Sequence, residues 1–111
     1  AVYHGLLGTW KQDEIGWWYQ TLDGTYLYNC SEYIDNNWYV FDEQGYMMTG
    51  PIWNKETGNL NLFNQDGALV TDAGWVEISN NEWVYVWGKY CVVNRETPDG
   101  YFIDETGIWK E

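Results

Sequence analysis

Five glycines divide this chain into segments of nearly equal length. Gly24, Gly45, Gly67, Gly88 and Gly107 are separated by 21, 22, 21 and 19 residues. A period near 21 residues is typical of arrays in which one small unit cannot bury its apolar face alone and packs on its neighbours. The spacing therefore predicts a repeat protein built from short units.

A similar sequence motif ends at most of these glycines. Residues 38–45, 60–67 and 100–107 read WYVFDEQG, LNLFNQDG and GYFIDETG, and residues 17–24 read WWYQTLDG as a looser copy. Aromatic and β-branched runs predict strands, here over residues 38–41, 60–63, 83–87 and 101–103, whereas Asp, Asn and Gly predict turns. We therefore predict an all-β fold, a solenoid-like array of about five β-hairpins, each with its glycine at the turn, where positive φ is easily adopted.

The whole chain, residues 1–111, is predicted to be a single repeat domain. Its hairpin units are expected at approximately 8–29, 30–49, 50–71, 72–94 and 95–111. Cys30 and Cys91 are then about three repeats apart, or about 30 Å if stacked sheets advance about 10 Å per repeat. A disulfide needs Cα atoms within about 7 Å, so we expect free thiols.

Aromatic residues and acids dominate the composition. Rings make up 20% of the residues, and the formal net charge is -12. This charge argues against nucleic acid and anionic membrane surfaces as partners and favours a cationic or neutral ligand, although acids in turns also simply keep an aromatic-rich chain in solution. No stretch approaches the roughly 20 apolar residues of a membrane span, so membrane insertion is not expected.

Tryptophans recur between the predicted hairpins. Trp10, Trp53 and Trp75 fall in the connectors, seven or eight residues before the next strand position. Such rings either anchor the core or face outward as a binding wall. A quaternary ammonium gains roughly 0.5 to 2 kcal/mol from each ring, so a three-ring cage supports about millimolar affinity, and several cages bind a polymer by avidity. The same rings could stack on sugars.

Catalysis and metal binding have little support in the sequence. The single histidine, His4, stands near the amino end, and no nucleophile, base and acid suggest a buried catalytic arrangement. Acids and amides at residues 42–43 and 64–66 lack the spacing of a calcium loop and are explained by turns. The sequence predicts a protein that is not an enzyme, with no catalytic residue, no metal site and no cofactor.

Two stretches resemble a known family. Residues 8–26, GTWKQDEIGWWYQTLDGTY, and residues 37–50, NWYVFDEQGYMMTG, are similar to the choline-binding, or cell-wall-binding, repeats of surface proteins, autolysins and phage lysins. The similarity is strongest over residues 8–50 and recognisable to about residue 77. It implies a left-handed β-solenoid that holds choline between hairpins, in a secreted, cell-wall-associated protein whose partner is a choline-decorated wall polymer.

The resemblance also implies which rings bind the ligand. The candidate ligand-binding residues are Trp10, Trp17, Trp18, Trp38, Tyr39, Trp53, Trp75, Trp83 and Tyr101. In the aromatic boxes that the resemblance implies, Trp17 or Trp18 pairs with Trp38, Trp38 with Trp53, Trp75 with Trp83, and Trp83 with Tyr101. Each box lacks one of its three rings. Ser31 stands where a connector Trp belongs, Leu60 replaces a strand Trp and so affects two boxes, and nothing aromatic precedes the last hairpin at the expected place.

These departures leave other functions open. The leading alternative is a carbohydrate-binding module, of the glucan-binding kind, on the same scaffold, and another is a degenerate structural or protein-interaction tail. Gly8-Thr-Trp10 also matches the Gly-x-Trp opening of lipocalin-like barrels, but the 21-residue spacing and the short chain argue against that fold. Pairing of the chain into a homodimer is left open.

Overall fold

The computed structural model describes residues 7–111, and His4 lies outside the described residues. The described chain contains strands, turns and bends but no helix, so the predicted all-β class is confirmed. The strands are β1 Gly8–Gln12, β2 Trp17–Thr21, β3 Cys30–Ile34, β4 Asn37–Phe41, β5 Gly50–Trp53, β6 Leu60–Phe63, β7 Gly74–Ser79, β8 Glu82–Trp87, β9 Tyr90–Cys91, β10 Arg95–Glu96, β11 Phe102–Ile103 and β12 Trp109–Lys110.

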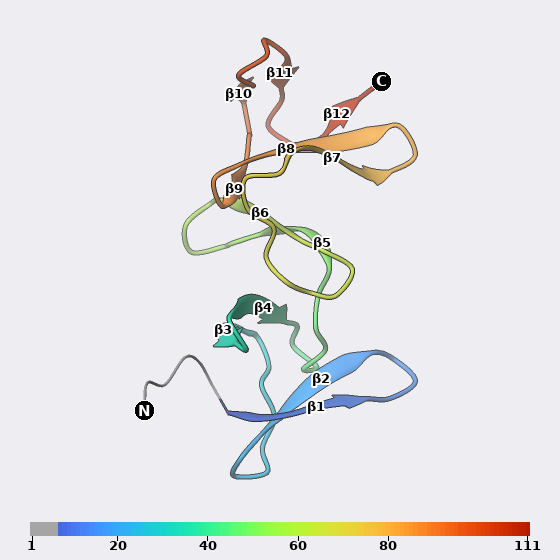
Figure 1. The fold of residues 1–111 in the computed structure, drawn as a ribbon, viewed down its shortest axis with the longest axis vertical. Coiled ribbons are helices and arrows are strands. Elements are labelled where there is room, and N and C mark those ends of the chain that lie inside the picture. The colour runs from blue at the N-terminus through green and yellow to red at the C-terminus, as the bar shows by residue number, and fades with distance from the viewer. Residues whose placement is uncertain (1–6) are drawn as a thin grey trace. The chain divides into compact units, whose positions relative to one another are not determined.

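Antiparallel hairpins make up the fold (Figure 1). Consecutive strands pair as β1–β2, β3–β4, β5–β6, β7–β8 and β10–β11, and β8 also pairs with β9 and β12 to complete a four-stranded sheet. The four runs predicted as strands correspond to β4, β6, β8 and β11. Asp35 and Asn36 join β3 to β4 with φ values of 49° and 72°, the geometry of a type I′ turn that suits tight hairpins.

The turns of the extended hairpins differ from the prediction. With Gly45 and Gly67 at the hairpin turns, the chain after each glycine should pair with the strand before it, but only single bridges form there, Phe41 to Met47 and Phe63 to Leu69. The extended pairing is made instead with the segment before each predicted strand, so the supposed connectors of Trp10, Trp53 and Trp75 are strands β1, β5 and β7. After Met47 the chain soon reaches Gly50, which starts the next hairpin, so no length remains for a longer return strand.

The chain forms two compact units. The first consists of residues 7–49 and Gln65–Ala68, and the second of Gly50–Asn64 and Leu69–Glu111. The predicted single domain with its five repeat boundaries stays a prediction. No helix of the described residues has the length and apolar character to cross a membrane.

Glycine at two of the periodic turns has a second role besides its backbone conformation. Gly45 and Gly67 have φ values of 95° and 83°. A Cβ atom at Gly45 would lie 2.7 Å from the Tyr26 ring, and one at Gly67 would lie 2.2 Å from the Met47 sulfur. Tyr26 and Met47 each stand two residues after the preceding periodic glycine, so the side chain that follows one turn packs on the glycine of the next. This contact favours glycine at these two of the five periodic positions.

Each unit has its own core. In the first unit Tyr19, Ile34 and Phe41 are buried together. The second unit buries a cluster of aliphatic side chains and one thiol, namely Leu60, Leu62, Val84, Val86 and Cys91.

Both cysteines are free thiols, as expected. Burial raises the pKa of Cys91 to about 12, and burial together with the Glu32 carboxylate raises the pKa of Cys30. Both thiols are therefore protonated at neutral pH.

Candidate functional site: an aromatic sheet face

Strand β8 separates two kinds of side chain. Val84 and Val86 are 0% and 1% exposed and point into the core, whereas Trp83, Tyr85 and Trp87 alternate with them and lie on the opposite face. This alternation follows from the two-residue period of a strand. The outer face of the sheet is therefore lined by rings.

The neighbouring strands add two more rings to this outer face. Trp75 of β7 is paired with Tyr85, and Trp109 of β12 is paired with Trp83. Paired residues on adjacent strands share a face, so all four side chains lie on the same side of the sheet. Trp75 and Trp83, a predicted box, are diagonal neighbours there.

Three rings of the second unit gather into one group, which we call the Trp75 cluster. Trp75, Tyr101 and Trp109 have centroid separations of 5.9, 5.7 and 5.6 Å, with interplanar angles of 84°, 61° and 79°. Such edge-to-face pairs are favourable beyond their buried area. Tyr101 is 49% exposed while the two indoles are half-buried, so the cluster is reached from the solvent side of Tyr101.

The dimensions of the Trp75 cluster suit a small cation. A point about 4 Å above the plane of three centroids spaced in this way lies about 5 Å from each ring, within the roughly 6 Å over which a cation is attracted to an aromatic face. A cation at that point is within range of all three rings, and the strength of each contact depends on how far the face of that ring turns toward it.

A carboxylate borders the cluster. The Trp75 indole Nε1–H donates to Oδ2 of Asp99 at 3.0 Å. Hydrogen bonds from the Thr97 hydroxyl and from Trp75 hold the pKa of Asp99 below its ordinary value, so this group is ionised at neutral pH. Trp83 is oriented in a similar way, because its indole Nε1–H donates to Oε1 of Glu111 at 3.0 Å.

The structure therefore groups some predicted residues and adds one. Trp75 and Tyr101 lie together, and their third partner is Trp109, which sequence reasoning missed. Trp109 stands two residues after a glycine, as Trp10 does, and that local similarity was the available signal. Trp83 lies beside the cluster, paired with Trp109 on the ladder.

In the first unit the predicted rings divide between core and surface. Trp10 and Tyr39 contact each other at a centroid separation of 4.9 Å and pack against the core cluster. Trp17 and Trp38 are 41% and 45% exposed. The ring partners of Trp18 and Trp38 are Tyr26 and Tyr33, respectively, rather than each other.

Trp53 of the second unit is 44% exposed at the end of β5. Its predicted box with Trp38 joins residues of different units and stays a prediction.

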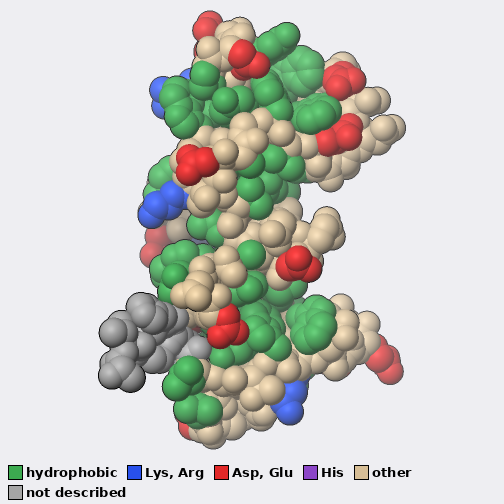
Figure 2. Space-filling model, in the orientation of Figure 1, with side chains coloured by type: hydrophobic (Ala, Val, Ile, Leu, Met, Phe, Trp, Pro, Cys, Tyr) green, Lys and Arg blue, Asp and Glu red, His purple; other side chains and the backbone are tan. Residues whose placement is uncertain are grey.

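Figure 2 shows hydrophobic side chains exposed at many places on the visible face, with carboxylates spaced among them. Within residues 7–111, no three His, Cys, Asp or Glu side chains are grouped as metal ligands.

Two known proteins are similar to part of this chain in sequence. The lysin of Pneumococcus phage Dp-1 is 44% identical over 50 residues, which is 43% of this chain and 17% of the lysin. Glucosyltransferase-I of Streptococcus downei is 30% identical over 85 residues, which is 72% of this chain and 5% of that enzyme. No protein-family model matches the chain.

Solved structures match most of the chain. A multimodular pneumococcal cell wall endolysin from phage Cp-1, complexed with choline, has a TM-score of 0.66 and 30% identity, over 88% of this chain and 31% of that one. Choline-binding protein F of Streptococcus pneumoniae, in complex with ipratropium, has a TM-score of 0.70 and 26% identity, over 95% of this chain and 32% of that one.

A third solved structure is a choline-binding domain by itself. The domain of CbpL from Streptococcus pneumoniae has a TM-score of 0.62 and 25% identity, over 94% of this chain and 54% of that one. The chain belongs to the choline-binding repeat family. This choline-binding-repeat chain spans less than a fifth of the two curated relatives that it matches, so it corresponds to a part of each.

Proposed function

We propose that this chain is a non-catalytic attachment module that binds the choline groups of a cell-wall polymer and belongs to a secreted, wall-associated protein. The observation that carries the proposal is the Trp75 cluster, in which Trp75, Tyr101 and Trp109 pack together beside the ionised Asp99, with Tyr101 exposed to solvent. The similarity of the chain to an endolysin complexed with choline gives independent support.

The expected binding free energy is that of a weak site, which binds a polymer firmly only together with other such sites. Three rings at roughly 0.5 to 2 kcal/mol each give a choline affinity near the millimolar range. Exposed Trp17, Trp38 and Trp53 are candidate walls of further cages. On a polymer that bears many choline groups, such cages act together, because after the first contact the others bind at a high local concentration.

The attachment role is supported by the part of each relative that matches. The similar segments cover 31% of the phage Cp-1 endolysin and 54% of the CbpL choline-binding domain chain. We assign this chain the binding role and leave catalysis to other parts of such proteins. Nucleic acid is not a proposed partner, because the net charge of -12 repels a polymer that carries a phosphate at every nucleotide.

Carbohydrate binding is the second candidate function. The relationship to Glucosyltransferase-I favours it, since that similarity extends over 72% of this chain. Exposed rings bind sugar faces as well as cations. In this second candidate function, a sugar would therefore occupy the ring surfaces that are proposed for choline.

The test is a titration of tryptophan fluorescence with choline up to tens of millimolar, beside a parallel titration with a soluble glucan. A saturable response to choline, and elution from a diethylaminoethyl resin by free choline at constant ionic strength, are the expected results. Elution by salt alone would show that net charge holds the protein on the resin. A response to glucan without a response to choline would replace the proposal by the second candidate.

A further inference from the structure

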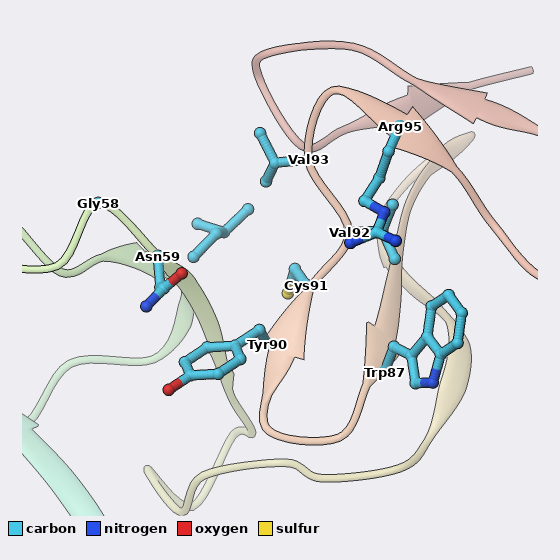
Figure 3. A pocket seen from close by; sticks show the side chains of 9 residues that line it. Gly58, Asn59, Trp87, Tyr90, Cys91, Val92, Val93 and Arg95 are labelled. Carbon is cyan, nitrogen blue, oxygen red and sulfur yellow. The ribbon is translucent and has the colours of Figure 1, made fainter.

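The second unit contains a pocket away from the Trp75 cluster. It has a volume of about 370 Å³ and lies between the segment that leads into β6 and the β8–β9 hairpin, as Figure 3 shows. Leu60, Cys91 and Val92 contribute buried, apolar lining. A volume in this range accommodates a small ligand such as one sugar unit.

The only arginine of the chain lies at this pocket. The Arg95 guanidinium carbon is 5.7 Å from the centroid of the Trp87 ring, a cation–π contact that fixes the side chain. Within residues 7–111 the one ion pair joins Lys110 to Glu82, so Arg95 has no carboxylate partner although the chain carries 17 acids. A guanidinium placed in this way keeps N–H donors available for a planar or tetrahedral anion.

Polar and aromatic groups face Arg95 from the other side of the pocket. In Figure 3, Tyr90 and Asn59 stand opposite the Arg95 side chain. Tyr90 is 45% exposed, so its ring offers a face on which a sugar can stack. The Asn59 amide offers a donor and an acceptor for hydroxyl groups.

From these neighbours we propose that the pocket is a second binding site, for a sugar unit that carries a phosphate or carboxylate group. Arg95 binds the anionic group, Tyr90 stacks on the sugar ring, and Trp87 positions Arg95. The site takes a ligand of opposite charge to choline, so it does not depend on the proposed choline function. Together the two sites would bind both the cationic and the anionic parts of one decorated glycan.

The test is to titrate the full chain, at saturating choline, with glucose 6-phosphate, glucuronate, glucose and inorganic phosphate in separate experiments. Binding is monitored through the amide signals in NMR spectra. We expect saturable shifts at residues 87–95 with both anionic sugars, and at least tenfold weaker binding of glucose and of inorganic phosphate. Arg95→Gln should weaken the binding of both anionic sugars about tenfold, with Arg95→Lys in between, and Tyr90→Ala should weaken it severalfold.

Lys11→Gln is the matched control, because it removes one positive charge from the first unit, and it should leave the affinity unchanged. Equal binding of glucose and glucose 6-phosphate, or equal effects of Arg95→Gln and Lys11→Gln, would overturn the proposal. So would inorganic phosphate binding as tightly as its sugar ester, since the pocket would then hold an anion without a sugar. Choline is held at saturation in these titrations and its own binding is measured in the separate fluorescence titration. A failure of choline binding is therefore distinguished from a failure of this second site.

Discussion

The indole N–H of Trp75 is hydrogen bonded to the carboxylate of Asp99, and the distance between Nε1 and Oδ2 is 3.0 Å. This bond holds one wall of the Trp75 cluster in a fixed orientation. It also places a negative charge at the edge of a site that we propose for a cation. Asp99 is thus a positioning residue whose charge should be measurable through ligand affinity.

Asp99→Asn should weaken choline binding about twofold to fivefold at pH 7, because the nearby charge is lost while an oxygen acceptor for Trp75 remains. The pKa of Asp99 is lowered, so its charge persists above the ordinary value near 3.8 and is lost only as the pH falls through the lowered pKa. Wild-type affinity should therefore be flat from pH 8 to pH 5 and decline below about pH 4. Fluorescence titration at each pH measures both effects. Glu43→Gln removes an equal charge elsewhere, and an equal loss in that variant would contradict a local role for Asp99.

Trp109→Leu tests the ring that the sequence did not reveal. Leucine keeps apolar volume on β12 but removes the aromatic face, so choline affinity should fall by about twofold to thirtyfold, the equivalent of roughly 0.5 to 2 kcal/mol. Isothermal calorimetry would measure the change. Trp87→Leu is the control, because Trp87 lies on the same face and is 52% exposed but is outside the cluster. Similar losses in both variants would show that the cluster is not the site.

The sequence predicted the fold class and the repeat but not the pairing of the strands. The residues of β4, β6 and β8 are apolar enough to be identified as strands, whereas β1 and β3 read GTWKQ and CSEYI and look like connectors. Lys11 and Gln12 in β1, and Ser31 and Glu32 in β3, interrupt the apolar positions, so hydrophobic alternation is weak in these two strands. Which neighbour a strand selects depends on turn geometry as well as on its own residues.

The structure brings two of the rings proposed from the sequence together, but with a different third ring. The sequence proposed Trp75 and Tyr101 as binding rings and paired each of them with Trp83. Trp109 belongs to the cluster because β12 pairs with β8 across more than 20 residues of sequence, and a local period carries no information on that contact. Trp10 and Tyr39, by contrast, pack on the first core, since the paired strands turn both rings to the same side as Tyr19 and Phe41.

Acid should destabilise the turn after β2 through Asp23. Hydroxyl groups of Thr21 and Thr25 donate to its carboxylate and lower its pKa to about 2. A lowered pKa stabilises the folded state above the ordinary value near 3.8, and this stabilisation is lost as the pH falls toward 2. Urea unfolding followed by circular dichroism should show Asp23→Ala to be less stable than wild type at pH 6. The difference should shrink at pH 2, and a difference that persists there would exclude the carboxylate as its origin.

The periodic glycines should differ in how well they tolerate a side chain. Gly24 and Gly45 have φ values of 89° and 95°, so alanine at either position carries a similar backbone strain of roughly 1 to 2 kcal/mol. A Cβ at Gly24 meets nothing within 4 Å, whereas one at Gly45 would lie 2.7 Å from the Tyr26 ring and 3.0 Å from the Leu27 carbonyl oxygen. Gly45→Ala should therefore lower the free energy of unfolding by about 1 kcal/mol more than Gly24→Ala, as measured by urea denaturation. Adding Tyr26→Ala to Gly45→Ala should recover part of that excess, because the displaced ring is gone. Equal losses at the two glycines would mean that backbone conformation alone, and not the packing of one turn's side chain on the next, requires glycine at this period.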